Sequence, residues 1–145
     1  MSKSISAVEE EIIDEFSLFD DWMDKYQYII EMGQNLPGIP EDKKTEDNIV
    51  HGCQSQVWLI ADDEGGEVHY QADSDAVITK GLIALLIRVL SDHSPEEILK
   101  TDMGFVDRIG IREHLSPNRS NGLYAMIKQM KIYALAYQAK AKQNK

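Results

Sequence analysis

Residues 50–75, VHGCQSQVWLIADDEGGEVHYQADSD, contain the pattern that decides the fold class. Two runs rich in β-branched and aromatic residues, 57–61 and 68–72, flank the acidic, glycine-containing segment 62–66, which is typical of a hairpin turn. The first run is apolar on both sides, which predicts a strand covered on both faces. The second run alternates, and its inward residues are expected to be Val68, Tyr70 and Ala72. Residues 49–51 are expected to add a third short strand.

Segments with the apolar spacing of helices lie before and after this hairpin. A capping box at Ser6–Glu9 predicts a first helix, and an apolar stripe over residues 22–33 predicts a second helix with Gly33 and Pro37 as stop signals. The prolines and charged residues of segment 36–48 predict a connecting loop. After the hairpin, residues 73–75 are expected to cap a strongly apolar central helix that runs to about residue 91.

The C-terminal third continues as helix. A capping box with proline at the first helical position, residues 94–97, predicts a further helix, whereas segment 105–115 is ambiguous because glycines interrupt it. The last helix is expected to begin at Ser116–Pro117 or at Ser120. The order of elements predicts an α+β fold, with a short antiparallel sheet of about three strands packed with helices. A chain of 145 residues is most simply one domain, residues 1–145.

Charge and hydropathy exclude several classes of partner. The chain has 25 acidic and 15 basic residues and a net charge of −10. Nucleic acids and anionic membranes attract basic surfaces, so neither is an expected partner. The longest strongly apolar run, residues 81–87, is much shorter than the ~20 residues of a membrane-spanning helix. Residues 1–11 lack the apolar centre of a secretory signal, and a cytoplasmic location is expected.

Cys53 is the single cysteine of the chain. One cysteine forms no intramolecular disulfide and supplies no multi-cysteine zinc or iron–sulfur site, so no metal or cofactor is expected. A free cysteine is commonly a small buried hydrophobe without chemistry. Cys53, however, lies between Gly52 and Gln54, where a loop leads into a strand. This placement favours a thiol that is presented to a partner, as a persulfide carrier requires.

Four segments of the chain resemble the SufE family. Residues 52–58, Gly-Cys-Gln-Ser-Gln-Val-Trp, match its cysteine signature. Residues 26–36 resemble its second helix, residues 73–84 the start of its central helix, and residues 114–123 the start of its last helix. The resemblance implies the fold that SufE shares with IscU-type scaffold proteins. It also implies that Cys53 accepts persulfide sulfur from a cysteine desulfurase.

The resemblance also implies that Asp75 and Arg119 lie near the thiol or on the partner surface. The further candidates for residues that support the thiol or bind the partner are His51, Gly52, Gln54, Ser55 and Asp73. Arg119 falls in the first turn of a helix, where the helix dipole disfavours a cation, so it is expected to face an anion or to form an ion pair. Asp75 is expected to cap the central helix or to serve the site. His51 is expected to be a solvent-exposed strand residue or to assist the thiol.

The implied function is that of a carrier and not of an enzyme. The expected partners are a SufS-type cysteine desulfurase, which is a PLP enzyme, and a downstream iron–sulfur scaffold complex of SufBCD type; a homodimer is an open arrangement. A CsdE-like acceptor for a paralogous desulfurase is the alternative. An IscU-like cluster scaffold is disfavoured because it needs several thiolates. A cysteine protease is disfavoured because it needs an oriented base beside the thiol.

Overall fold

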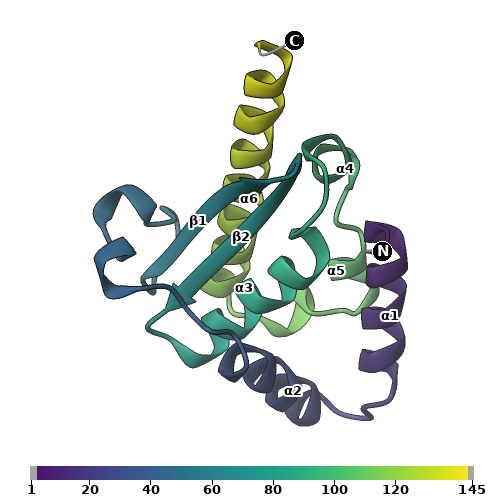
Figure 1. Ribbon diagram of the computed structural model, residues 1–145. Coiled ribbons are helices and arrows are strands. Elements are labelled where there is room, and N and C mark those ends of the chain that lie inside the picture. Colours follow the sequence, from purple (N-terminus) through teal and green to yellow (C-terminus); the bar gives the residue numbers. More distant parts are fainter. Residues whose placement is uncertain (1–2, 144–145) are drawn as a thin grey trace.

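In the computed structural model, which describes residues 3–143, a hairpin of two antiparallel strands lies against a set of helices (Figure 1). The strands are β1 (Val57–Glu64) and β2 (Glu67–Ser74). The helices are α1 (Ile5–Ser17), α2 (Trp22–Gln34), α3 (Val77–Leu90), α4 (Pro95–Lys100), α5 (Phe105–Arg108) and α6 (Pro117–Gln143). Short 3-10 turns occupy Glu41–Lys43, Glu46–Asn48 and Arg112–His114. The α+β class predicted from the sequence is confirmed.

The hairpin forms because two glycines supply its turn. β1 and β2 pair in register from Val57 opposite Ser74 to Glu64 opposite Glu67. Gly65 and Gly66 connect them with φ of +64° and +89°, a conformation that favours glycine. The described sheet has two strands instead of about three, because only the isolated bridge between Ile49 and Trp58 forms on the other edge of β1. The chain turns away directly after it, at residues 51–52.

One face of the hairpin packs on α3 and α6, and α6 passes behind the hairpin in Figure 1. Its buried side chains are Val57, Leu59, Val68, Tyr70 and Ala72. For β2 these are the residues that the alternation predicted, whereas the opposite face of β1, with Trp58 and Ile60, is only partly buried and not fully covered as expected. Tyrosine hydroxyls of the neighbouring elements satisfy backbone carbonyls across this contact. Tyr70 donates to the Met130 carbonyl at 2.6 Å, and Tyr137 donates to the Ala61 carbonyl at 2.8 Å. The core therefore fixes the position of α6 against the hairpin.

Helices α2 and α3 approach so closely that glycine is required at their contact. A Cβ atom on Gly81 would lie 2.2 Å from the Ile29 carbonyl oxygen, and one on Gly33 would lie 2.7 Å from the Gly81 nitrogen. Gly33 is therefore not a stop signal. It lies inside α2, which continues to Gln34, and its role is packing.

Local hydrogen bonds correct two of the predicted caps and confirm a third. Ser4, and not Ser6, caps α1, because its Oγ accepts from the Ala7 N–H at 3.1 Å. No side chain of residues 73–75 caps the first turn of α3, whose cap position is Ala76. Ser94 caps α4 as predicted, since its Oγ accepts from the Glu97 N–H at 3.2 Å.

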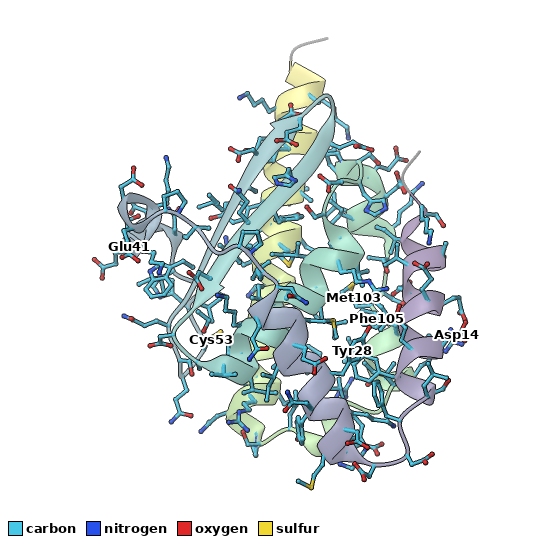
Figure 2. The ribbon with its side chains drawn as sticks, turned by 60° about the horizontal axis from the view of Figure 1, so that its bottom comes forward. Asp14, Tyr28, Glu41, Cys53, Met103 and Phe105 are labelled. Atoms are coloured by element: carbon cyan, nitrogen blue, oxygen red, sulfur yellow. The ribbon has the colours of Figure 1, made fainter. Side chains whose placement is uncertain are left out.

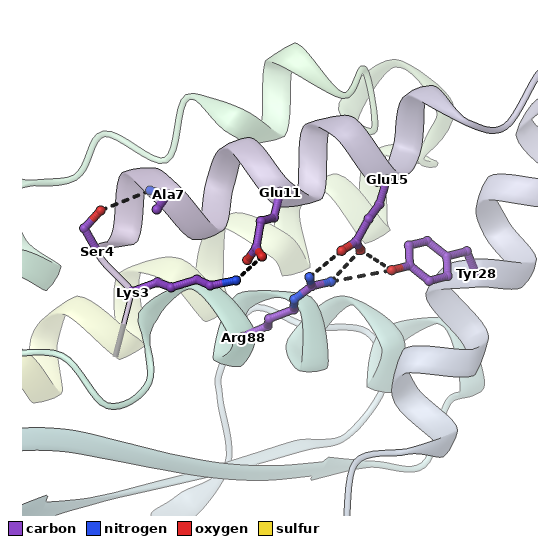
Figure 3. Close-up of polar contacts among 7 residues, drawn as sticks. All are labelled: Lys3, Ser4, Ala7, Glu11, Glu15, Tyr28 and Arg88. Atoms are coloured by element: carbon purple, nitrogen blue, oxygen red, sulfur yellow. Dashed lines mark hydrogen bonds and ion pairs between the residues drawn. The ribbon is translucent and has the colours of Figure 1, made fainter. Parts of the chain in front are cut away.

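Helices α1, α2 and α3 are joined by a polar cluster at their partly exposed edge (Figure 3). Arg88 of α3 donates to both carboxylate oxygens of Glu15 on α1, at 2.7 and 2.6 Å. Tyr28 of α2 also donates to Glu15. The hydrogen bonds from Arg88 hold the pKa of Glu15 below its usual range. This cluster fixes the positions of α1 and α2 relative to α3.

The ambiguous segment 105–115 consists of the short helix α5 and the 3-10 turn Arg112–His114. The following helix α6 begins at Pro117, and the Ser116 Oγ accepts from the Arg119 N–H at 3.2 Å as a cap. Within residues 3–143, no helix is both long enough and apolar enough to cross a bilayer.

Candidate functional site

Cys53 lies in the loop of residues 51–56 that leads into β1, and this loop is pressed against α6. Gly52 has φ of +96°, which favours glycine, and a Cβ atom there would lie 3.2 Å from the Ala125 Cβ of α6. The glycine therefore both turns the chain and lets it approach the helix. The result is that the next residue, Cys53, is directed at the first turns of α6.

The thiol of Cys53 is half-buried against a glycine of α6. Its Sγ donates to the Gly122 carbonyl at 3.6 Å. A Cβ atom on Gly122 would lie 3.4 Å from this sulfur, at ordinary contact distance. Gly122 therefore contributes the carbonyl and leaves space beside the sulfur. In Figure 2, Cys53 lies on the side of the molecule away from Asp14 of α1.

The sulfur opens into a cavity of about 330 Å³. Three segments line it: the cysteine loop, α3 and the start of α6. Besides Cys53, the lining residues are Gln54, Ser55, Thr79, Leu82, Ser116, Asn118, Arg119, Gly122 and Met126. The buried side chains of this lining are Thr79, Leu82 and Met126, whereas the exposed ones are polar, so the cavity shields a sulfur atom on one side and is open to a partner on the other.

Burial raises the pKa of the Cys53 thiol above its ordinary range. No charged neighbour among the described residues contributes to this shift. In this conformation burial therefore favours the neutral thiol, which is the less reactive form.

Alkylation of Cys53 should show this directly. We expect the rate of iodoacetamide labelling to reach its midpoint at a higher pH in the folded protein than in the same protein unfolded in denaturant. Because burial favours the neutral thiol, less thiolate is present at neutral pH and labelling there should be slower. Equal midpoints in the two states would show that burial does not control the reactivity of this thiol.

Asp75 braces the cysteine loop and does not cap α3. Its carboxylate accepts from the Gln56 N–H at 3.0 Å, and its own N–H donates to the Gln56 carbonyl at 3.3 Å. The adjacent Ser74 hydroxyl donates to the same carbonyl at 2.8 Å. The predicted capping role is therefore wrong for Asp75, and the residue instead closes the end of the loop that carries Cys53.

Replacement of Asp75 should loosen this loop. We expect Asp75→Ala to increase the labelling rate of Cys53 at a fixed pH, at a cost of about 1 kcal/mol in the free energy of unfolding. Asp47→Ala is the matched control, because Asp47 is an exposed acid of the preceding segment and the change in charge is the same. If both variants label at the wild-type rate, the Asp75–Gln56 bonds do not restrain the thiol.

Asp73 of β2 holds the segment of residues 36–48 in place. Its carboxylate forms ion pairs with Lys44 at 3.2 Å and with Lys80 at 3.3 Å. Burial alone would raise the pKa of Asp73, but hydrogen bonds from the Ser74 N–H and the two lysines outweigh it, so that the pKa is lowered. A Cβ atom on Gly38 would lie 2.7 Å from this carboxylate. Asp73 thus attaches the 36–48 segment to β2 and does not line the cavity.

Arg119, Gln54 and Ser55 lie at the cavity, whereas His51 does not. Arg119 is exposed, lines the cavity, and has no acidic partner within ion-pair distance in the described part of the chain. The Gln54 side chain accepts from Asn118 Nδ2 at 3.2 Å, which links the loop to α6. His51 is exposed in the turn before Cys53, not in a strand.

The sequence analysis missed the residues that complete the cavity. Gly122 gives the thiol its hydrogen-bond acceptor, and Thr79, Leu82 and Met126 supply the wall behind it. Thr79 and Leu82 are three residues apart on the central helix, and Met126 follows Gly122 by four residues. Helical spacing places each pair on one face, but only the packed fold shows that both faces meet at Cys53.

One group of three residues in segment 3–143 has metal-ligand chemistry. Glu64, His69 and Asp92 have ligand atoms within 4.8 Å of one another, at the hairpin end remote from Cys53. His69 Nδ1 is 2.7 Å from the Asp92 carboxylate, and this contact raises the pKa of His69. The cluster is exposed and is a histidine–carboxylate contact at the surface, separate from the thiol.

Comparisons with known proteins place the chain in one family. A family model described as "SufE: Fe-S metabolism associated domain" matches residues 10–134. The chain is 42% identical over 130 residues to an uncharacterized SufE-like protein of Rhizobium meliloti, covering 86% of this chain and 93% of that protein. It is 42% identical over 127 residues to an uncharacterized SufE-like protein of Rhizobium etli, covering 84% and 86%.

A solved structure has the same fold. The solution structure of a hypothetical protein from Thermus thermophilus matches with a TM-score of 0.76 and 25% identity. The match covers 91% of this chain and 96% of the other. The arrangement of hairpin and helices is therefore shared well beyond the sequences that are closely similar.

Proposed function

This chain belongs to the SufE family of sulfur-transfer proteins, and from this we propose that Cys53 accepts persulfide sulfur from a cysteine desulfurase and passes it on for iron–sulfur cluster assembly. We propose further that residues 1–145 act as one sulfur-acceptor domain that also activates the desulfurase. The observation that carries the proposal is the half-buried Cys53 thiol at the edge of a cavity with a polar rim.

The proposed transfer is a thiol–persulfide exchange. The Cys53 thiolate attacks the outer sulfur of the persulfide on the desulfurase cysteine, so that a new S–S bond forms at Cys53 and the old S–S bond breaks. The desulfurase cysteine leaves as a thiolate, and the outer sulfur stays on Cys53 as a persulfide. The reaction has no net oxidation or reduction and requires no cofactor on this chain.

Two features of the free protein suit such a carrier. Burial raises the thiol pKa, which keeps Cys53 inert toward stray disulfides until a partner binds. The cavity beside the sulfur has room for an additional sulfur atom. A docked desulfurase must turn the thiol outward, and the Asp75–Gln56 contact is the restraint that this movement releases.

Intact mass measurement tests the proposal. After incubation with a cysteine desulfurase and free cysteine, we expect the protein to gain one or more sulfur atoms at Cys53 and to lose them on treatment with a reductant. The same incubation without cysteine is the control. A protein whose mass stays unchanged in the presence of an active desulfurase would not be a sulfur acceptor.

The desulfurase partner is either a SufS-type enzyme or the paralogous enzyme that a CsdE-like acceptor serves. An IscU-like cluster scaffold remains the less favoured interpretation, because the chain has a single cysteine and a scaffold needs several thiolates. We propose a SufBCD-type complex as the downstream acceptor and the cytoplasm as the compartment, where a lone thiol stays reduced.

We propose that Arg119, at the rim of the cavity, contacts the partner. Arg119→Ala is expected to slow sulfur transfer about tenfold, the loss of one charge-assisted hydrogen bond. It should leave the pKa of Cys53 in the free protein unchanged, because burial alone raises that pKa. Lys140→Ala, the same charge change at the far end of α6, is the control. Equal transfer rates in the two variants would remove Arg119 from the partner surface.

A further inference from the structure

Helix α6 has a second apolar stripe on the face that does not contact the core. Tyr124, Ile132 and Leu135 are 41%, 46% and 56% exposed. With spacings of eight and three residues they form one stripe along the helix. Together with the half-buried Leu99 of α4 and Ile127 they line a groove of about 510 Å³. Large apolar side chains gathered in one exposed groove are typical of a binding surface.

The charged residues that line this groove are both cationic: they are Lys128 and Lys131. The Arg112 guanidinium lies 5.1 Å from the centre of the Tyr124 ring, but Asp107 pairs with it at 2.8 Å, so the two lysines supply the positive charge of the groove. Neither lysine forms an ion pair within residues 3–143; Lys131 donates to the Thr101 carbonyl. In a chain of net charge −10 this is a local basic surface. Its occupant should therefore be apolar and acidic.

The connection between α1 and α2 has this chemistry. Leu18 and Met23 are 79% and 83% exposed, more than the other exposed large hydrophobic residues of the described chain. Three exposed aspartates lie on the same connection or in the first turn of α2: Asp20, Asp21 and Asp24. None of them forms an ion pair with a described basic side chain, and the single basic residue beside them is Lys25.

We propose that the α1–α2 corner of one molecule binds in the α6 groove of a second copy of this chain. Met23 and Leu18 enter the apolar groove, and the aspartates of the corner face Lys128 and Lys131. In Figure 1 the corner lies at the bottom of the view, whereas α6 rises behind the hairpin to the top. A molecule therefore does not fill its own groove, and the contact joins two different surfaces, head to tail.

This contact leaves Cys53 accessible. The thiol meets α6 at Gly122, and the groove begins at Tyr124, two positions on, which is about 200° around a helix of 3.6 residues per turn. The groove and the thiol therefore lie on opposite sides of α6. Associated copies would each keep an open thiol, so the labelling rate of Cys53 should not change with protein concentration.

Sedimentation of complementary variants tests the contact. Met23→Lys places a positive charge on the acidic corner and leaves the groove unchanged. Leu135→Glu places a negative charge in the basic groove and leaves the corner unchanged. Both residues are exposed, so folding should be unaffected. Val77→Lys, at a 61% exposed residue outside both surfaces, is the control. We expect the weight-average mass of the wild type to rise with protein concentration up to millimolar and to fall as salt screens the charges.

Each variant alone should remain a monomer, the control should associate like the wild type, and an equimolar mixture of the two variants should form dimers. The mixture restores one intact corner and one intact groove, so recovery there identifies the contact as head to tail. A wild type that stays monomeric at every concentration overturns the proposal and would leave the groove to a different acidic partner. A mixture that stays monomeric, or a single variant that associates like the wild type, also overturns it.

Discussion

Cys53→Ser is expected to abolish sulfur acceptance while leaving the fold intact. Serine is nearly isosteric with cysteine, and the Cys53 side chain is only half-buried, with one long hydrogen bond to Gly122. We therefore expect a loss of less than about 1 kcal/mol in the free energy of unfolding. The serine hydroxyl does not form a persulfide, so the mass gain seen after incubation with desulfurase and cysteine should disappear completely.

A displaced thiol provides the matched control for this variant. Cys53→Ser combined with Ser55→Cys returns a cysteine to the lining of the same cavity, two residues further along the loop. We expect this double variant to accept sulfur far more slowly than the wild type, because the thiol no longer faces Gly122. Sulfur uptake by the single serine variant would contradict the carrier role of Cys53. A large loss of stability would instead indicate that Cys53 is a core residue.

Gly81→Ala is expected to cause a large loss of stability for the addition of a single methyl group. The added Cβ would lie 2.2 Å from the backbone oxygen of Ile29 and 2.6 Å from the Ile29 Cγ2. A backbone atom cannot move aside as a side chain does, so α2 must shift away from α3. We expect a destabilisation of about 3 kcal/mol or more, which exceeds the ~1 kcal/mol that alanine gains over glycine in a helix.

Chemical denaturation monitored by circular dichroism measures this loss. Gly104→Ala is the control, because Gly104 has an ordinary negative φ and its added Cβ would meet only the Asp102 side chain, at 3.1 Å. A loss of less than about 1 kcal/mol is expected for the control. If Gly81→Ala is as stable as the control, α2 and α3 are not held together at the glycine contact.

The hairpin and its helical surroundings were predictable because the signals are local. Turn glycines need only their own backbone angles, and strand alternation needs only neighbouring residues, so 57–61 and 68–72 were identified as strands. The cap at Ser94 follows from a four-residue pattern. The third strand was not formed, because pairing at Ile49 depends on the path of the chain after it, and that path turns at residues 51–52.

The sequence by itself determined the α+β class, the single thiol and its place before β1, because these follow from periodicity and composition. Only the tertiary structure decided what surrounds that thiol. Gly122 is 69 residues from Cys53 and Asp75 is 19 residues from Gln56, so neither contact is visible as a local pattern. Gly33 likewise has the local signal of a helix stop, and only the close contact with α3 shows that its role is packing. Such contacts depend on how distant segments pack, and packing is settled by the whole core at once.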